Sequence, residues 1–222
     1  MTLAIDRLVP YNLAVLIVYG SARIGLTPNL VSFLSGGIAF IAFVLGISLP
    51  HDQGYMPILL IYGTSQLSYV FDCADGQLAR ATNAMSRFGD FLDKGVDIAS
   101  FTLLFGGFFA YLYRHFVAAG DSDAAVRWLL LGFLFLLARI SRFAVWQRLE
   151  VELGVENAEK ASGDGGGVMA LKNFMDMQVS LFGMLLFPLA PDLTYALFAM
   201  QTVVLAVVYV RYFFRAKDLF DT

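Results

Sequence analysis

The sequence predicts an all-α integral membrane protein with six transmembrane helices and an N-terminal interfacial amphipathic helix. Of its 222 residues, 59% are hydrophobic and only 15% are charged, and the mean hydropathy is +0.70. Soluble domains are usually about 45–50% apolar and about 25% charged. Several mostly apolar runs are also long enough to cross a bilayer, for which a helix needs about 20 residues. We therefore expect residues 1–222 to form a single membrane domain.

Six apolar runs form the predicted transmembrane core, which covers residues 28–214. The first run follows Thr27, which can cap a helix, and has Pro28 in its first turn. Pro191 and Asp192 mark the turn between the last two runs. The predicted spans are Pro28–Leu49, Met56–Asn83, Phe88–His115, Ala124–Leu149, Val168–Leu189 and Asp192–Phe214.

Residues 1–25 precede this core and differ from it. Pro10 and Asn12 interrupt the apolar run of residues 1–20, which leaves a stretch too short to span a bilayer. We interpret the stretch as an amphipathic helix lying in the membrane interface, with a re-entrant segment as the alternative. No basic region followed by a cleavage site opens the chain, so we expect no removable signal peptide.

The basic residues predict the orientation. Of the 15 Lys and Arg residues, only Arg114 and Arg127 fall on the side opposite the two termini. Because Lys and Arg are enriched in cytoplasmic loops, we expect both termini and the active site to face the cytoplasm from the cell inner membrane. The acidic and then glycine-rich segment of residues 150–167 is interpreted as a flexible connector, with a lid over a substrate site as the alternative.

Two of the apolar runs carry aspartates at regular spacing. On a helix, Asp72 and Asp75 share one face of the second predicted span, and Asp93 and Asp97 share one face of the third. If the two spans fold as an antiparallel hairpin, Asp72 lies level with Asp97 and Asp75 lies level with Asp93, because both pairs are centred near residue 84. The four carboxylates are thus expected to meet at matching depths in the cytoplasmic half of the bilayer.

Four carboxylates inside a membrane need compensating charge, because each buried charge costs several kcal/mol. Divalent cations supply it, and an all-oxygen ligand set selects Mg²⁺ or Mn²⁺. Four aspartates suit two ions that share a ligand, as at sites of phosphoryl displacement. The single cysteine, Cys73, gives no basis for a Cys/His zinc site.

Small residues and one arginine accompany the aspartates. Gly76, Ala79 and Gly89 allow a second helix or a flat ligand to approach closely. Arg80 lies one turn further toward the cytoplasm, where its planar guanidinium can hold a phosphate.

The pattern D-x-x-D-G-x-x-A-R at Asp72–Arg80, followed by G-x-x-x-D-x-x-x-D at Gly89–Asp97, resembles the signature of the CDP-alcohol phosphotransferase family at every motif position. The resemblance implies a metal-dependent transferase of phospholipid biosynthesis. Such an enzyme moves a substituted phosphate from a CDP-linked donor to the hydroxyl of an alcohol acceptor and releases CMP. It also implies contact with membrane lipid, a homodimer and no nucleic-acid partner.

The resemblance assigns roles by position. Asp72, Asp75 and Asp93 would ligate two metal ions, and Asp97 would complete the metal site and act as general base on the acceptor hydroxyl. The residues that would bind the nucleotide are Asp72, Gly76, Ala79, Arg80 and Gly89.

Five further residues are candidates outside this motif. Arg139, Arg142 and Lys172 can hold a phosphate of the acceptor, although arginines near a helix end also extend to the headgroups. Asn29 can reach the nucleotide or simply serve the start of its helix, and Asp90 can support Asp93 or be an interfacial charge.

The sequence leaves the substrates open. CDP-diacylglycerol is the preferred donor, because the compact chain shows no appended domain. The alternative is a soluble CDP-alcohol donor with a lipid or polyol-phosphate acceptor. Two other classes, a cation transporter with intramembrane aspartates and a metal-binding scaffold, do not explain the spacing of Arg80 and the glycines.

Overall fold

The computed structural model describes residues 10–51, 54–153 and 176–220, and within these ranges every regular element is a helix. Four of the helices are long and apolar enough to cross a membrane, namely α2, α4, α5 and α9. The described elements are α1 (Pro10–Ile24), α2 (Pro28–Ser48), α3 (Met56–Ala81), α4 (Arg87–Ala118), α5 (Ser122–Leu153), α8 (Met177–Leu186) and α9 (Pro191–Phe220).

The helices begin where side chains cap them. Thr27 accepts a hydrogen bond from the Leu30 amide at 3.4 Å, and Pro28 is the first residue of α2, as predicted. Ser86 accepts one from the Gly89 amide at 2.9 Å and so starts α4. The turn between α3 and α4 includes Asn83, whose φ of 52° lies in the left-handed region that asparagine tolerates.

Two predicted spans are not among these four helices, α3 because it is less apolar and α8 because its described part is short. Helix α3 has 26 residues but carries Gln66, Asp72 and Asp75 among its apolar side chains. Helix α8 has 10 described residues, and the first part of the predicted Val168–Leu189 span lies outside the described residues. Six spans therefore remain a prediction, whereas the described residues are helical and include four helices long and apolar enough to cross a membrane.

The six described helices after α1 form a closed ring of contacts. Helix α2 packs against both α3 and α4, α4 packs against α5, α5 against α9, α9 against α8, and α8 against α3. Helices α3 and α4 meet at the aspartates as predicted, but both contact α2 far more than they contact each other. Small residues on α2 allow it to lie between them, so the two aspartate-bearing helices meet only locally.

Helices α2 and α4 cross at a contact between glycines. A Cβ atom built on Gly46 would lie 2.1 Å from the carbonyl oxygen of Gly107, and one built on Gly107 would lie 2.7 Å from the Cα of Phe43. Only residues without a side chain allow two helix backbones to approach this closely. The crossing fixes α2 against α4 roughly 15 Å from Asp97, as ten residues at about 1.5 Å per residue give.

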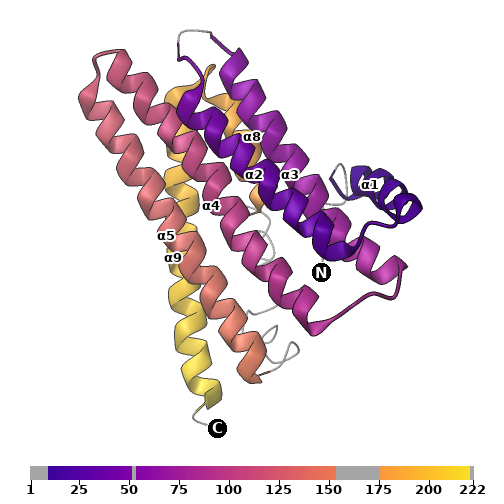
Figure 1. Ribbon diagram of the computed structural model, residues 1–222. Helices are drawn as coiled ribbons and strands as arrows, with labels where there is room; N and C mark the ends of the chain where they lie inside the picture. The colour runs from indigo at the N-terminus through magenta and orange to yellow at the C-terminus, as the bar shows by residue number, and fades with distance from the viewer. Residues whose placement is uncertain (1–9, 52–53, 154–175, 221–222) are drawn as a thin grey trace.

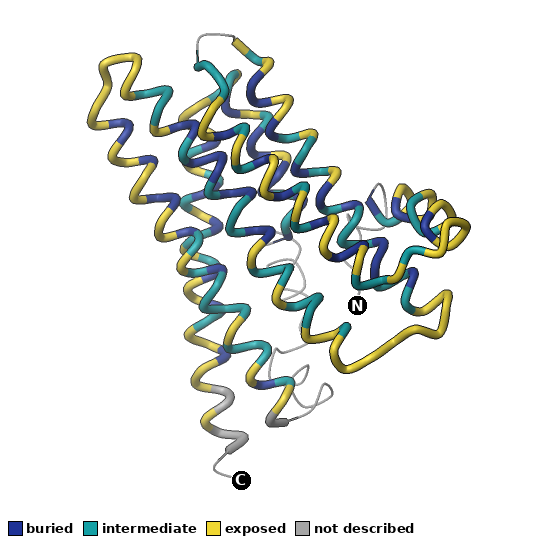
Figure 2. The backbone as a smooth tube through the Cα atoms, in the orientation of Figure 1, coloured by how far each residue is buried: buried dark blue, intermediate teal, exposed yellow. Residues whose placement is uncertain are grey.

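Aromatic side chains fill the centre of the ring, and apolar side chains also cover its outside. The rings of Phe105 and Phe135 pack with centroids 5.1 Å apart, and those of Phe109 and Phe198 with centroids 5.3 Å apart. Figure 2 shows exposed positions along the outer faces of the helices, and these positions include Phe133 and Val203. An apolar exterior around a packed aromatic core is what a bilayer environment requires.

Helix α1 lies outside the ring against α3 (Figure 1). Gln77 of α3 donates a hydrogen bond to the carbonyl of Tyr11 at 3.2 Å. Helix α1 is described from Pro10 to Ile24, and the residues before Pro10 lie outside the described residues, so the interruption of the apolar run at Pro10 stays a prediction. Leu16 and Ile24 are exposed on this helix.

Candidate active site

The carboxylates of the sequence motif come together where α3 and α4 approach each other. One oxygen from each of Asp72, Asp93 and Asp97 lies within 4.8 Å of the others, a spacing that can hold a metal ion. The carboxyl group of Asp72 lies in hydrogen-bonding contact with that of Asp97, and the carboxyl group of Asp75 with that of Asp93. The predicted pairing of these residues in two layers is therefore seen in the structure.

Asp75 is held by the neighbouring helix α2. Its side chain is 4% exposed, and Ser32 donates a hydrogen bond to Oδ2 at 2.5 Å. The amide of Gly76 donates to Oδ1, also at 2.5 Å. Hydrogen bonds to a carboxylate are stronger than those between neutral groups, so Ser32 fixes the direction in which Asp75 points.

The two carboxylate pairs open onto two different cavities. Asp75 and Asp93 line a cavity of about 200 Å³, which also contains Arg80 and is called the Arg80 cavity below. Asp72 and Asp97 line a second cavity of about 190 Å³, called the Arg139 cavity. Each of the two cavities is thus lined by two of the four aspartates.

The Arg80 cavity contains the small residues of the motif. Gly76, Ala79 and Arg80 line it from α3, as predicted from their common helix face. A Cβ atom on Gly76 would lie 3.5 Å from Nη1 of Arg80, so the guanidinium folds back over this glycine. The small residues therefore leave room for Arg80 and a ligand, rather than for a second helix.

The other wall of the Arg80 cavity comes from α2 and the start of α4. Asn29, Gly89 and Asp90 line it, and a Cβ atom on Gly89 would lie 3.3 Å from Oδ1 of Asn29. Because Thr27 caps α2, the Asn29 side chain is placed in the cavity instead. Asp90 is exposed and forms a 3.1 Å ion pair with Lys94 one turn further along α4.

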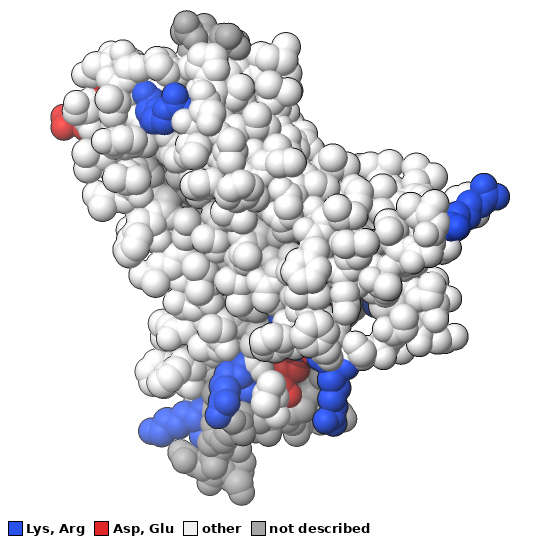
Figure 3. Space-filling view, viewed as in Figure 1, with Lys and Arg blue, Asp and Glu red and all other residues white. Residues whose placement is uncertain are grey.

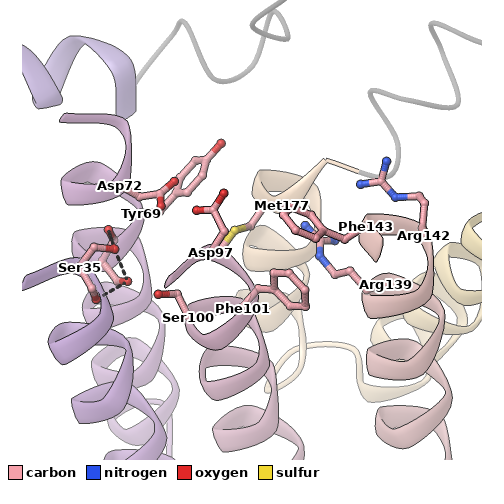
Figure 4. Close-up of a pocket in the computed structure, with 11 residues that line it drawn as sticks. Ser35, Tyr69, Asp72, Asp97, Ser100, Phe101, Arg139, Arg142, Phe143 and Met177 are labelled. Carbon is pink, nitrogen blue, oxygen red and sulfur yellow. Dashed lines mark hydrogen bonds between the residues drawn. The ribbon is translucent and has the colours of Figure 1, made fainter. Parts of the chain in front are cut away.

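The Arg139 cavity combines acidic and basic walls. Figure 4 shows Asp72 and Asp97 on one side of it and Arg139 and Arg142 across from them. Arg139 is 7% exposed, and its guanidinium lies 5.5 Å from the ring centroid of Phe105 in a cage that Phe101 and Phe135 complete. An arginine buried among aromatic rings is oriented by them and keeps its donors for polar partners.

The structure describes Arg142 but not Lys172, the other two residues predicted to bind the acceptor phosphate with Arg139. Arg142 hydrogen-bonds to Tyr212 of α9, and its buried Nε has no hydrogen-bond partner among the described residues. Simple extension of Arg139 and Arg142 to the headgroups is therefore not what the structure shows, since both line a cavity. Lys172 and residues 154–167 of the predicted connector lie outside the described residues.

The sequence reasoning missed the serines of the site. Ser32 holds Asp75, while Ser35, Ser68 and Ser100 line the Arg139 cavity. A usable signal was present, because Ser32 and Ser35 follow Asn29 at intervals of three residues in an otherwise apolar helix. Polar side chains that recur on one face of a membrane helix mark the face turned toward a polar interior.

The surface view agrees with a polar opening at one end of the bundle. Figure 3 shows acidic side chains in a hollow at the lower end of the molecule, between two groups of basic side chains. The α3–α4 turn and the end of α9 lie at this same end in Figure 1. The described remainder of this face is almost entirely uncharged, as expected for lipid contact.

Comparisons with known proteins bear on the fold and the family of this chain. A search of curated proteins finds no significant match. The fold is similar to the crystal structure of Mycobacterium tuberculosis phosphatidylinositol phosphate synthase in complex with manganese and citrate, with a TM-score of 0.64 and 20% sequence identity, over 91% of this chain and 88% of that chain. The family model for CDP-alcohol phosphatidyltransferase matches residues 25–210, which contain both halves of the motif. The chain therefore belongs to the CDP-alcohol phosphatidyltransferase family and is an integral membrane transferase of phospholipid biosynthesis.

Proposed function

We propose that this transferase moves a phosphatidyl group from CDP-diacylglycerol to a hydroxyl of a polyol phosphate and releases CMP. The observation that carries the proposal is the cluster of four aspartates, two of which line each of two polar cavities. A displacement at phosphorus needs its entering and leaving oxygens on opposite sides. Two cavities that are each lined by two of these aspartates suit this requirement.

The donor fits the Arg80 cavity. Gly76, Ala79 and Gly89 leave space for the nucleotide, and the guanidinium of Arg80 lies beside them, where it can bind the pyrophosphate. Phe88 and Phe91, the sequence neighbours of the cavity residues Gly89 and Asp90, are exposed. They offer an apolar surface for the acyl chains of a lipid donor, which favours CDP-diacylglycerol over a soluble CDP-alcohol.

The acceptor fits the Arg139 cavity. Arg139 and Arg142 provide two cationic groups opposite Asp97, so an acceptor that carries its own phosphate is bound at one end and presents a hydroxyl at the other.

Asp97 acts as the general base. The acceptor oxygen forms a bond to the β-phosphorus of the donor, and the bond from that phosphorus to the oxygen bridging to CMP breaks. The acceptor proton passes to the Asp97 carboxylate, and the electron pair of the broken bond leaves with CMP. Arg80 holds the pyrophosphate during this exchange and balances the charge that develops on the leaving group.

The carboxylate cluster fits divalent cations. Three mutually repelling carboxylates within 4.8 Å form an all-oxygen donor set of the kind that Mg²⁺ and Mn²⁺ prefer. Asp72, Asp93 and Asp97 would hold one ion, and Asp75 would join Asp72 and Asp93 at a second. When bound, the ions polarise the phosphoryl oxygens and neutralise their charge.

We further propose the full topology expected from the sequence. Six spans and an interfacial α1 would place both termini and the active site at the cytoplasmic side of the inner membrane. Arg114 supports this orientation, since it donates hydrogen bonds to the carbonyls of Gly46 and Leu49 at the end of α2 remote from the aspartates. The homodimer remains a prediction.

The test is CMP release by the purified protein in detergent with Mg²⁺ or Mn²⁺. CDP-diacylglycerol and a panel of soluble CDP-alcohols are supplied in turn, each with glycerol 3-phosphate, inositol 1-phosphate or an uncharged alcohol. We expect metal-dependent release with CDP-diacylglycerol and a phosphorylated acceptor, and loss of about 10²–10⁴-fold in Asp97→Asn with nucleotide binding retained. Release only with a soluble donor would refute the lipid donor, and release with an uncharged alcohol alone would refute the role of the arginines.

A further inference from the structure

Ser100 is a polar residue of the Arg139 cavity to which the roles above give no function. It lies on α4 three residues after Asp97, so the two side chains share one face of the helix. Ser100 is 5% exposed, and its buried Oγ has no hydrogen-bond partner among the described residues. In Figure 4 the hydroxyl lies below Asp97, and both residues line the cavity.

A free hydroxyl is unusual on these helices. Serine and threonine in a helix can donate to the carbonyl four residues earlier. Thr102, two residues further along α4, does so to Ile98 at 2.6 Å, and Ser65 of α3 does so to Ile61 at 2.7 Å. Ser100 does not make the corresponding hydrogen bond to the carbonyl of Val96. Because an unpaired buried hydroxyl is costly, a bound ligand is expected to supply its partner.

The neighbouring serines do not supply that partner. Ser35 donates to the carbonyl of Ser68 at 3.0 Å, and Ser68 donates to the carbonyl of Ser35 at 3.0 Å. This reciprocal pair joins α2 to α3 and uses the donors of both hydroxyls. Ser100 is therefore the cavity serine whose donor is available to a small polar molecule next to Asp97.

We propose that Ser100 binds the acceptor hydroxyl adjacent to the one that reacts, and so selects a polyol phosphate over a monohydroxy phosphate. This inference rests on the proposed function. Side chains three residues apart on a helix have Cβ atoms about 5–6 Å apart, which lets neighbouring hydroxyls of one small polyol reach both Asp97 and Ser100. Arg139 and Arg142 hold the phosphate of the same molecule across the cavity.

The test compares acceptors that differ by one hydroxyl. The kcat and KM for CMP release are measured with glycerol 3-phosphate and with 3-hydroxypropyl phosphate, which lacks the middle hydroxyl. A second pair is inositol 1-phosphate and its deoxy analogues, each lacking one ring hydroxyl. Wild type, Ser100→Ala and the control Ser65→Ala are used, the control removing a buried hydroxyl that is bonded within its own helix.

We expect Ser100→Ala to raise the KM of the complete polyol phosphate about 3- to 10-fold and to leave that of the analogue unchanged, the size expected for one hydrogen bond between neutral groups. Ser65→Ala should change neither. An equal change for both acceptors, no change, or a fall in kcat alone would overturn the role of Ser100. If wild type releases CMP but uses no polyol phosphate, this inference fails while the transferase chemistry stands; if it releases no CMP with any pair, the proposed function fails as well.

Discussion

Replacing Gly46 with alanine tests whether the glycine crossing of α2 and α4 holds the site together. The new methyl group would lie 2.1 Å from the carbonyl oxygen of Gly107, 2.4 Å from its carbonyl carbon and 2.7 Å from its Cα. All three atoms are backbone, so no side-chain rotation relieves the overlap. Ordinary contact begins at 3.4 Å, so the helices must separate by about 1.3 Å, the difference between 3.4 and 2.1 Å.

The expected cost follows from that separation. Inserting a methyl group into a packed interior typically costs about 1–3 kcal/mol, and a contact between two backbones belongs at the upper end of that range. Alanine regains about 1 kcal/mol through its higher helix propensity. The net destabilisation is therefore about 2 kcal/mol, which at roughly 2–4 °C per kcal/mol lowers Tm by several degrees.

Thermal unfolding in detergent, followed by loss of the monodisperse species, measures this effect. Gly106→Ala is the matched control, because its methyl group would meet only the ring of Phe43 at 3.8 Å. We expect Gly106→Ala to unfold at or above the wild-type temperature and Gly46→Ala to unfold below it. Equal Tm values for the two variants would refute the close crossing of α2 and α4.

Three further predictions concern the site itself. Ser32→Ala removes the 2.5 Å hydrogen bond to Asp75 and should raise the Mn²⁺ concentration for half-maximal CMP release about 10- to 100-fold, while Ser65→Ala leaves it unchanged. A metal requirement unaffected by Ser32→Ala would show that Asp75 is oriented by other groups. Arg142→Ala should raise the KM of a phosphorylated acceptor about 10- to 100-fold and leave that of the CDP donor unchanged, as loss of a hydrogen bond to a charged group implies, and an unchanged acceptor KM would contradict its role. Added CMP should compete with the donor and not with the acceptor in initial-rate measurements, because the two are assigned to different cavities; competition with the acceptor would mean that both share one cavity.

The spacing of the aspartates was enough to predict the carboxylate cluster. Helical periodicity places Asp72 level with Asp97 and Asp75 level with Asp93 once the two helices run antiparallel, and both pairs are found. The start of α2 could also be predicted from Thr27 and Pro28, because helix capping depends on neighbouring residues in the chain. Such features depend on a few neighbouring residues and a fixed helical geometry.

The partners of these helices could not be read in the same way. A one-dimensional hydrophobic pattern does not distinguish a hairpin of α3 and α4 from a three-helix arrangement with α2 between them. The position of α2 depends on Gly46 meeting Gly107, a contact between residues 61 positions apart, which the sequence numbers give as 107 − 46. The spacing of Ser32 marks a polar face of α2, but its partner Asp75 lies on another helix and is not given by that spacing.

The position of α2 suits the proposed use of one short motif by two substrates. If α3 and α4 packed closely along their length, Asp72, Asp75, Asp93 and Asp97 would be buried in a single seam with no room for a ligand. Because α2 holds them apart, Asp75 and Asp93 face the Arg80 cavity while Asp72 and Asp97 face the Arg139 cavity. A phosphorus atom bound at these aspartates can then be approached from the Arg139 side while its leaving group departs on the Arg80 side. The glycines and serines of α2 are thus as necessary to the proposed reaction as the aspartates, although only the aspartates take part in its chemistry.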